Sequence, residues 1–559
     1  MGVVYRMSDE NKSTLFDGFG EGDDTPTTYI KKPMEDNKPP QFLKDDEERR
    51  LEQKNIEAEK LMAACYFNEN DIAPWNGTIH PIFKEWEDIA TEIVYSRPSY
   101  HFANLLSLLS MSLNRKVGVK VAFDIIYPSV YVADIGVTTI SGKSWSFTTL
   151  INRMRDAVIK QEIKIVHKDK TGQDIKVEKI ATVKKKGKKG EEEDEEVINP
   201  NGIKLLQQMC TNARFAQEIA EIHNILWYYN EAREFFTDAD SNSGFNKSII
   251  NNLCGAYDCG VVDRNLSKRN KDDKTNTSGC DEAFVSLNFN MTVKQLKECC
   301  SGSLFSSGFA PRFMWFVETG GKMERNKTAS PAQEARAMAL KMRIKEISDK
   351  LFNLQNNSII FKVSDDVEDW KMKMSEKYGS NDDYQAIIGR GFIHVYKIAM
   401  IFSIYDEKFI NEILNKNPSA ASPLFIDIPK VWVDEAIRIY ENYLLPRMVK
   451  VLEMSNVEDK KNRQLYVLGK LKELNGVATI SKLLRATSYS EKELKVTLVS
   501  LQRAGQICAV VKRETGIDGK LKTGPATKYI CLVKDGKVDE IGKLMDVNEM
   551  MKEEEDKKK

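Results

Sequence analysis

The stretch Gly136-Val-Thr-Thr-Ile-Ser-Gly-Lys143-Ser144 constrains the fold of this chain more than any other segment. Residues 128–134 before it are apolar and β-branched and predict a buried strand, whereas residues 145–154 after it predict a helix. A strand, a glycine-containing loop and Gly-Lys-Ser at the start of a helix form the setting of a phosphate-binding loop. The alternative is a Gly-Lys-Ser tripeptide in an ordinary strand–helix turn.

The residues of this loop have candidate roles at a bound ATP. Backbone N–H groups and a helix N-terminus cradle a triphosphate. The candidate residues for this contact in the loop are Gly136, Thr138, Thr139 and Gly142. We expect Lys143 to reach the β- and γ-phosphates and the Ser144 hydroxyl to bind Mg²⁺. The loop is irregular, because Val137 stands where the usual spacing has a glycine.

A second apolar strand, at residues 222–229, is followed by Asn230 and Glu231. In nucleotide-binding sheets such a strand ends in an Asp for Mg²⁺ and a Glu that activates water. Glu231 can act as the general base. Asn230 can bind a metal only weakly through its carbonyl oxygen, so the metal would depend on Ser144 and on water. The alternative is a core strand with a polar end.

Two further polar residues flank predicted strands. Residues 283–290 form a third strand that ends in Asn290, which can contact the γ-phosphate or position the attacking water. Arg312 precedes another apolar strand at residues 313–317. An arginine there suits a finger that reaches the phosphate of a neighbouring subunit and stabilises transition-state charge. As an isolated residue, Arg312 can equally be structural.

These blocks, taken in order, resemble the phage and mobile-element P-loop ATPases that accompany primases, a helicase-like family long known only as a domain of unknown function. The resemblance covers residues 80–410 and includes a helix at residues 100–115, Thr138-Thr139, residues 253–258 with Arg264, Gly308-Phe-Ala-Pro-Arg312-Phe, and residues 394–399. Asn230-Glu231 falls where the family usually has Asp-Glu, so Val137 and Asn230 are the two departures.

The resemblance implies an α/β fold with a RecA/AAA-like P-loop NTPase core and with ATP and Mg²⁺ as cofactors. It also implies a homo-oligomeric ring, with a hexamer as the expected size, that acts on single-stranded and duplex DNA. A primase or a polymerase is a candidate further partner.

Composition limits the remaining possibilities. The chain has 559 residues, with 83 Lys and Arg against 83 Asp and Glu, so its net charge says nothing about nucleic acid. We expect no membrane-spanning run and no signal peptide, because no apolar run is long enough and the N-terminus is polar and acidic. The nine cysteines show no framework spacing, so we expect free thiols in a reducing cytoplasm. Cys254, Cys259, Cys280 and Cys299-Cys300 fit no zinc pattern.

The expected domains follow composition and periodicity. We predict a disordered tail at 1–45, a helical region at 46–116, and the ATPase core at 117–330 with a charged insertion at 162–200. A helical lid region at 331–455 completes the core, and a charged tail at 534–559 is helical or frayed from residue 540. Within the insertion, alternating residues from 163 to 180 predict a basic β-hairpin, with a solvated loop as the alternative.

Residues 462–533 predict a winged helix. Helices are expected at 464–474, at 479–484 and after Ser490, whose cap is completed by Glu493, and strands at 506–512 and 526–533. The third helix of a DNA-binding winged helix enters the major groove, and the candidate backbone contacts here are Lys492, Lys495, Arg503 and Lys512. The alternative is a winged helix that binds protein.

A second basic stretch lies between the second and third core strands. In ring ATPases such loops face the central channel and contact phosphates without regard to sequence, and the candidate contacts are Arg264, Lys268, Arg269 and Lys271. The alternative is a flexible surface loop.

The sequence therefore predicts an ATP-dependent, ring-forming DNA motor, a replicative helicase of a phage or mobile element. The alternative, a degenerate P-loop scaffold that initiates or loads replication, follows from Val137 and Asn230. A terminase or partition motor is a weaker possibility, and the lack of a nuclease carboxylate cluster in the sequence counts against a terminase.

Overall fold

A computed structural model describes residues 53–54, 56–57, 67, 72–138, 141–160, 163–168, 174–180, 194–198, 202–207, 210–240, 247–265, 277–319, 326–379, 382–487, 489–512, 527–533, 543–545 and 547. The chain divides into two compact units, Met1–Lys54 and Asn55–Lys559. Every element named below belongs to the second unit. The predicted tail at 1–45 lies outside the described residues.

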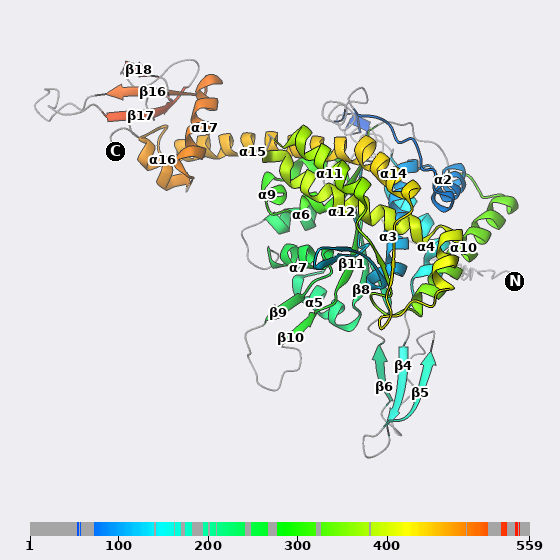
Figure 1. Ribbon diagram of the computed structural model, residues 1–559. Coiled ribbons are helices and arrows are strands. Elements are labelled where there is room, and N and C mark those ends of the chain that lie inside the picture. The colour runs from blue at the N-terminus through cyan, green and yellow to red at the C-terminus, as the bar shows by residue number, and fades with distance from the viewer. Residues whose placement is uncertain are drawn as a thin grey trace, which may run out of the picture. The chain divides into compact units, whose positions relative to one another are not determined.

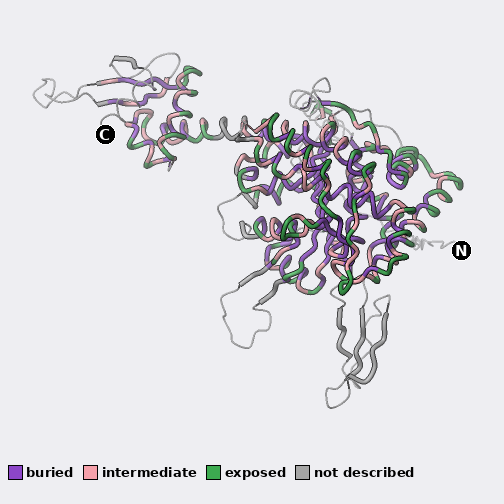
Figure 2. The backbone as a smooth tube through the Cα atoms, viewed as in Figure 1, coloured by how far each residue is buried: buried purple, intermediate pink, exposed green. Residues whose placement is uncertain are grey.

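The centre of the second unit is a five-stranded sheet in which every strand pair is parallel (Figure 1). Its order is β12-β3-β11-β8-β7. The strands are β3 (Tyr131–Gly136), β7 (Ile203–Leu206), β8 (Asn224–Tyr229), β11 (Phe284–Met291) and β12 (Phe313–Glu318). All positions of β3 and β11 are buried, as parallel strands covered on both faces require (Figure 2). The predicted α/β class is confirmed.

The strand order differs from the order along the chain. The strand β11 lies between β3 and β8, although it follows both of them in sequence. Since parallel strands align their carboxyl ends, the residues that follow β3, β8 and β11 meet at one edge of the sheet. Ligands of open parallel sheets bind in the crevice at such an edge, where the strand order reverses.

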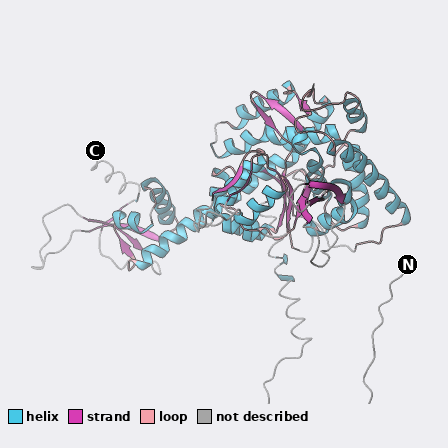
Figure 3. Cartoon of the chain, turned by 90° about the horizontal axis from the view of Figure 1, so that it is seen from below, coloured by secondary structure: helices cyan, strands magenta, loops and turns pink. Residues whose placement is uncertain are grey.

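Helices cover both faces of this sheet (Figures 1 and 3). On one face, α3 (Pro98–Leu113) contacts β3, β8 and β11, and α4 (Lys143–Val158) packs beside it. On the other face, α7 (Lys247–Tyr257) contacts β11, and α5 (Asn212–Glu221) packs against α7. Residues 99–113 of α3 are all buried, which is typical of a helix enclosed in a core.

The remaining helices of the α/β core surround this centre. They are α2 (Pro81–Ile93), α6 (Arg233–Asp240), α8 (Val293–Cys299), α9 (Gly302–Ser306), α10 (Pro331–Phe352), α11 (Asp365–Tyr378), α12 (Asp382–Ile404), α13 (Glu407–Leu414) and α14 (Lys430–Ile439). Helix α10 begins with a capping box, in which Ser330 and Gln333 exchange both hydrogen bonds. One face of α10, from Ala337 to Leu351, is buried.

The region 331–455, predicted to be helical, also contains two strands. A second sheet has the order β14-β13-β1-β2, formed by β1 (Val117–Val121), β2 (Asp124–Ile126), β13 (Ile359–Phe361) and β14 (Leu424–Ile426). The sequence prediction did not include β13 and β14, because strands of three residues are too short to give a periodic signal.

The charged insertion forms a three-stranded sheet. The predicted hairpin is confirmed, since β4 (Ile163–Lys168) pairs antiparallel with β5 (Asp174–Ile180). A third strand, β6 (Asp194–Ile198), pairs with the other edge of β4. Part of the acidic run at 191–196 within this insertion belongs to β6. The backbone of this segment pairs with the free edge of β4, and the charge of its side chains does not predict such pairing.

Helix α12 meets the length and composition of a membrane span, contrary to the sequence expectation that no run does. The stretch is Tyr384–Ile404, and 72% of an 18-residue window within it is buried inside the protein. It packs against α11, α14 and α3. Burial of this kind is typical of a core helix.

The chain passes from the core into its C-terminal part through one helix. A π-helical segment, Tyr440–Leu444, joins α14 to α15 (Leu445–Glu473). Pro446, in the first turn of α15, has no N–H to donate, which accounts for the displaced hydrogen bonds of the segment before it. The sequence predicted a helix at 464–474, apart from the helical region at 331–455, and α15 runs through the interval between them.

The C-terminal module consists of the end of α15 with α16 (Ile480–Thr487), α17 (Glu491–Arg503) and a sheet. The sheet has the order β15-β17-β16-β18, with β15 (Val477–Ala478), β16 (Ile507–Lys512), β17 (Thr527–Leu532) and β18 (Lys543–Met545). The predicted helices, the two long strands and the Ser490–Glu493 capping box are confirmed. The expected helix from residue 540 is wrong at β18, which pairs with β16.

This module has its own hydrophobic core, separate from that of the α/β core. Leu498 of α17 is fully buried in it. We expect Leu498→Ala to destabilise the module by about 2–5 kcal/mol, because truncation leaves a cavity. Calorimetry should then show an earlier transition for the module and an unchanged transition for the α/β core. Val496→Ala, at a side chain of the same helix that is 60% exposed, is the control. A common shift of both transitions would contradict separate cores.

Candidate functional site

One cavity, of about 330 Å³, lies where the carboxyl ends of β3, β8 and β11 meet. It is lined by Thr138, Ser141, Gly142, Lys143, Ser144, Trp145, Asn230, Glu231, Asn290, Met291, Thr292 and Gln295. The structure therefore brings together seven residues singled out in the sequence: Thr138, Gly142, Lys143, Ser144, Asn230, Glu231 and Asn290. Thr139 lies outside the described residues.

The loop from β3 to α4 is tightly constrained at its two glycines. Gly142, the N-cap of α4, has a left-handed φ of 69°, and a Cβ there would lie 2.2 Å from the carbonyl oxygen of Tyr95. At Gly136 a Cβ would lie 2.4 Å from the Tyr100 hydroxyl. Only glycine fits at either position. Val137 is 2% exposed and belongs to the hydrophobic core, so this departure from the usual spacing does not crowd the cavity.

Lys143 begins α4 and folds back over the loop. Its Nζ donates to the Gly136 carbonyl oxygen at 3.0 Å and to Ser141 Oγ at 3.4 Å. Both acceptors are neutral. A phosphate oxygen is charged and accepts a stronger hydrogen bond from an ammonium group, so a bound phosphate can draw Lys143 away from these two acceptors.

Ser144 and Asn230 join α4 to the end of β8. The Ser144 hydroxyl donates to Asn230 Oδ1 at 2.8 Å, and both residues line the cavity. Two oxygens side by side suit a hard cation such as Mg²⁺, although neither carries a formal charge. Among the described residues, no group of three or more His, Cys, Asp or Glu side chains could hold a metal, so a metal would need oxygens from phosphate or water.

Glu231 and Asn290 complete the cavity wall. Glu231 directly follows Asn230 with a left-handed φ of 62°, a strained conformation for a residue with a Cβ and one that occurs at functional sites. Asn290 donates from Nδ2 to the Tyr228 hydroxyl at 3.0 Å. Its Oδ1 is buried without a hydrogen-bond partner among the described residues. Glu231 thus offers an exposed carboxylate, and Asn290 an amide oxygen still able to accept.

Tyr228 is a residue of this site that the sequence analysis missed. Its ring stacks on Phe147 of α4 with centroids 3.6 Å apart, and burial raises the pKa of its hydroxyl well above the ordinary range. Residues two apart along a strand share a face. The position of Tyr228, two residues before Asn230, was therefore a usable signal.

A buried polar layer supports the loop from below. Asn104 of α3 donates to Ser146 of α4 at 2.8 Å and accepts from Asn288 of β11. His101 contacts the same Ser146 hydroxyl at 3.1 Å, and burial lowers its pKa to about 3, so the ring is neutral. Hydrogen bonds between buried groups fix the relative positions of α3, α4 and β11.

Asp134 is a buried carboxyl group within this layer. It is fully buried near the end of β3, and neither carboxylate oxygen has a hydrogen-bond partner among the described residues. Burial raises its pKa well above the ordinary value, and the positive charge of Lys143 offsets part of that effect. The sequence analysis treated Asp134 only as the end of a strand.

Arg312 lies away from this cavity. Strand β12 runs parallel to β3, with Phe313 opposite Tyr131 and Glu318 opposite Gly136, so Arg312 precedes the amino end of the sheet. The cavity is about 20 Å away along the strands. Arg312 is 7% exposed and donates to Asp258 at 2.9 Å and to the Gly308 carbonyl at 2.7 Å. It does not reach the cavity of its own chain, and an action on a neighbouring chain stays a prediction.

Only some of the residues predicted to contact DNA are among those that the structure describes. Arg264 lies in β9 (Val262–Asn265), which pairs with β10 (Thr277–Cys280), and its side chain is outside the described residues, as are Lys268, Arg269 and Lys271. Lys492, Lys495 and Arg503 lie on α17. Lys512 ends β16, and its side chain is also outside the described residues.

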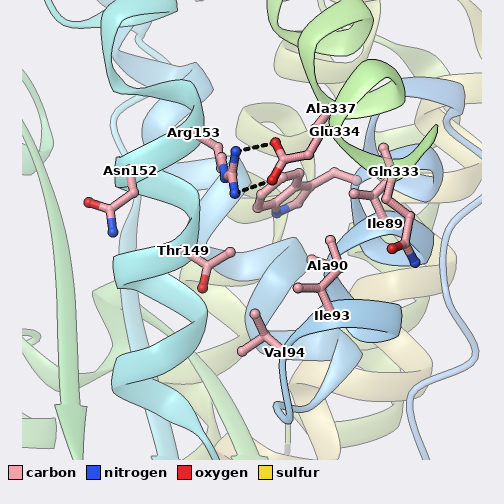
Figure 4. A pocket seen from close by; sticks show the side chains of 11 residues that line it. Ile89, Ala90, Ile93, Val94, Thr149, Asn152, Arg153, Gln333, Glu334 and Ala337 are labelled. Atoms are coloured by element: carbon pink, nitrogen blue, oxygen red, sulfur yellow. Dashed lines mark hydrogen bonds and ion pairs between the residues drawn. The ribbon is translucent and has the colours of Figure 1, made fainter. Parts of the chain in front are cut away.

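A second cavity, of about 310 Å³, lies between α2, α4 and α10 (Figure 4). Arg153 of α4 and Glu334 of α10 form a bidentate ion pair across it. Aliphatic side chains of α2, including Ile89 and Ile93, line the opposite wall. None of the residues predicted for the site lines this cavity.

None of the described cysteines forms a disulfide bond, in agreement with the thiols expected from the sequence. Comparison with known proteins adds no family assignment: no protein-family model matches the chain, and no curated protein matches it significantly. Any function proposed for this protein therefore rests on the geometry of the cavity at the carboxyl edge of the sheet.

The buried carboxyl group of Asp134 should make stability depend on pH. Its pKa is raised in the folded chain, so the stability it contributes is complete below the unfolded pKa and is lost as the pH rises through the folded pKa. We expect Asp134→Asn to stabilise the protein by about 1–3 kcal/mol near neutral pH and by much less near pH 4. Thermal unfolding at both pH values measures this difference. The exposed Asp124→Asn is the control, and an equal effect of Asp134→Asn at both pH values would contradict the assignment.

Proposed function

We propose that this chain binds and hydrolyses ATP at the cavity formed by the ends of β3, β8 and β11, and uses the energy to move along DNA. The observation that carries the proposal is the convergence of Lys143, Ser144, Asn230, Glu231 and Asn290 on one cavity. Asn230, Glu231 and Asn290 lie at the carboxyl ends of two adjacent parallel strands, β8 and β11, and Lys143 and Ser144 begin the helix that follows β3.

The fold supports a nucleotide at this place. A parallel sheet in which β11 is inserted between β3 and β8 is compatible with a RecA/AAA-like core. The start of α4 faces the cavity with Gly142, Lys143 and Ser144, and the N–H groups and the dipole of a helix N-terminus favour an anion. A triphosphate at this helix end would have its terminal phosphates near Lys143.

The side chains support hydrolysis as follows. Lys143 would hold the β- and γ-phosphate oxygens and stabilise charge on the leaving ADP. Glu231 would accept a proton from the water that attacks the γ-phosphorus, while Asn290 would orient that water through its amide. Ser144 and Asn230 would hold Mg²⁺, which when bound neutralises phosphate charge. Each of these groups lines the cavity.

The DNA-motor part of the proposal depends on the resemblance and on the C-terminal module. The end of α15, α16 and α17, followed by the antiparallel pair β16–β17, supports a winged helix. In that arrangement α17, with Lys492, Lys495 and Arg503, is the helix that would contact duplex DNA. A ring of identical chains, with a hexamer as the expected size, would bring Arg312 of one chain to the ATP of its neighbour.

A specific observation favours a second candidate function. Asn230 contacts Ser144 where an aspartate would add a negative charge for the metal. A chain that binds nucleotide but hydrolyses it poorly would be a DNA-binding initiator or loading scaffold. The turnover of ATP with and without single-stranded DNA separates the two functions.

Loss of the Lys143 ammonium should remove most ATP hydrolysis. We expect Lys143→Ala and Glu231→Gln each to lower the turnover by about 100-fold or more, because each removes a group aimed at charge that develops in the transition state. A coupled phosphate-release assay, with and without single-stranded DNA, measures the rates.

The matched control is Lys294→Ala, at an exposed lysine of α8 that does not line the cavity. Its turnover should equal that of the unmodified chain. Equal background rates in the unmodified chain and both site variants would reject the motor, and retained binding of a fluorescent ATP analogue would then favour the scaffold.

Asn230→Asp should strengthen the use of metal. A carboxylate next to Ser144 binds Mg²⁺ more tightly than an amide oxygen does, so half-maximal turnover should need about tenfold less Mg²⁺. A Mg²⁺ titration of ATP hydrolysis checks this. Asn152→Asp, at an exposed residue of α4 outside this cavity, makes the same charge change and should leave the titration unaltered. An unchanged or higher Mg²⁺ requirement in Asn230→Asp would remove Asn230 from the metal site.

A further inference from the structure

The C-terminal module contains a groove with a positive rim between α15 and α17. A cavity of about 420 Å³ is lined there by Arg463, Gln464, Lys495, Val496, Thr497, Val499, Ser500 and Arg503. Three of these residues are cationic, and none of the described lining residues is acidic. The groove is thus suited to a ligand that carries several negative charges.

The groove also has an apolar floor. Val496 is 60% exposed, and Val499 beside it is half-buried. Gln464 of α15 donates to Ser500 of α17 at 2.7 Å, so a hydrogen bond fixes the two walls. An exposed valine between cationic side chains gains from being covered by an apolar group whose neighbours are acidic. Phosphates alone would satisfy the rim and leave this floor exposed.

The C-terminal part of the described chain, at Val547, lies near one end of this groove. Val547 is fully buried in the core of the module, and its backbone N–H donates to Oε1 of Gln502 at 2.9 Å. Gln502 precedes Arg503, which lines the groove. Val547, the described residue immediately before the segment 548–559, therefore lies next to the C-terminal end of α17.

The chemistry of this segment complements the groove. Its sequence is Asn548-Glu-Met-Met-Lys-Glu-Glu-Glu-Asp556, followed by three lysines. Two adjacent methionines match the apolar floor, and four consecutive acidic residues match the cationic rim. Twelve extended residues span about 40 Å, whereas the helix between Lys495 and Arg503 spans about 12 Å. The acidic residues can reach the whole groove, and the last lysines can lie beyond it.

We propose that residues 548–559 dock in the groove between α15 and α17, with Met550 and Met551 on Val496 and Val499 and the acidic run on Arg463 and Arg503. The docked segment would occupy cationic groups that DNA phosphates would otherwise contact, and would thereby restrain DNA binding by α17. Only this consequence rests on the proposed DNA function, because the docking itself requires no nucleic acid.

The restraint has an expected size. A segment tethered by a short linker has a local concentration on the order of 1 mM. If the free peptide binds with a Kd of about 100 μM, the tethered segment lowers the DNA affinity of the module about tenfold. The effect should decrease with salt, because it depends on charge pairs at the protein surface.

The first experiment measures docking without DNA. A fluorescent peptide of residues 548–559 is titrated with a chain that ends at Val547, and anisotropy should rise with saturation at low salt. A peptide with Glu553, Glu554, Glu555 and Asp556 changed to Gln and Asn should bind at least fivefold more weakly. Arg463→Glu and Arg503→Glu should weaken the native peptide similarly, and Lys482→Glu, at an exposed lysine of α16 outside the groove, should not.

The second experiment measures the consequence. Duplex DNA affinity is compared for the full chain and the chain that ends at Val547, and truncation should raise it about tenfold at low salt. Peptide binding without DNA binding by either chain would support the docking and reject the proposed DNA function of the module. Absence of saturable peptide binding would overturn the docking, as would binding that Arg463→Glu and Arg503→Glu leave unchanged.

Discussion

The parallel pairing of β11 with both β3 and β8 is the constraint on which the rest of this structure depends. Parallel strands align their carboxyl ends, so the residues that follow three different strands are delivered to one edge of the sheet. Asn290 pairs in register with Asp134, near the end of β3. The cavity and the hydrogen bond between Ser144 and Asn230 are consequences of this register. A slip by one residue would turn Asn230 and Asn290 to the other face of the sheet.

The polar layer under the loop has a cost that an apolar core would avoid. Asp134 is buried without a hydrogen-bond partner among the described residues, and Asn104, Asn288 and His101 place further polar atoms between α3 and the sheet. Buried polar groups are tolerated when they are paired and costly when they are not. The Asp134 carboxyl lies close to the lysine that is proposed to bind phosphate. The buried carboxyl group therefore lowers the stability of the fold next to the candidate site, and such local costs are common at functional positions.

The edge of the site is also tied to the long helix α15. Glu318, which pairs in register with Gly136, accepts hydrogen bonds from Ser99 at 2.7 Å and from Tyr443 of the π-helical segment at 2.6 Å. Arg447 of α15 donates to the Val317 carbonyl at 2.9 Å. These contacts attach the start of α15 to the strand beside the β3–α4 loop. The same helix ends in the C-terminal module, where its last residues contribute to the core of that module.

The sequence by itself determined the local elements: the strand, glycine loop and helix around Lys143, the capped helices α10 and α17, and the polar ends of β8 and β11. Periodicity, caps and glycines are encoded within a few residues, so a sequence reveals them. Only the tertiary structure decided the insertion of β11 between β3 and β8, the short strands of the second sheet, the unpaired burial of Asp134 and the position of Arg312 at the opposite end of the sheet. These features depend on pairing between segments far apart in the chain, and no local pattern reports which distant segment a strand will meet.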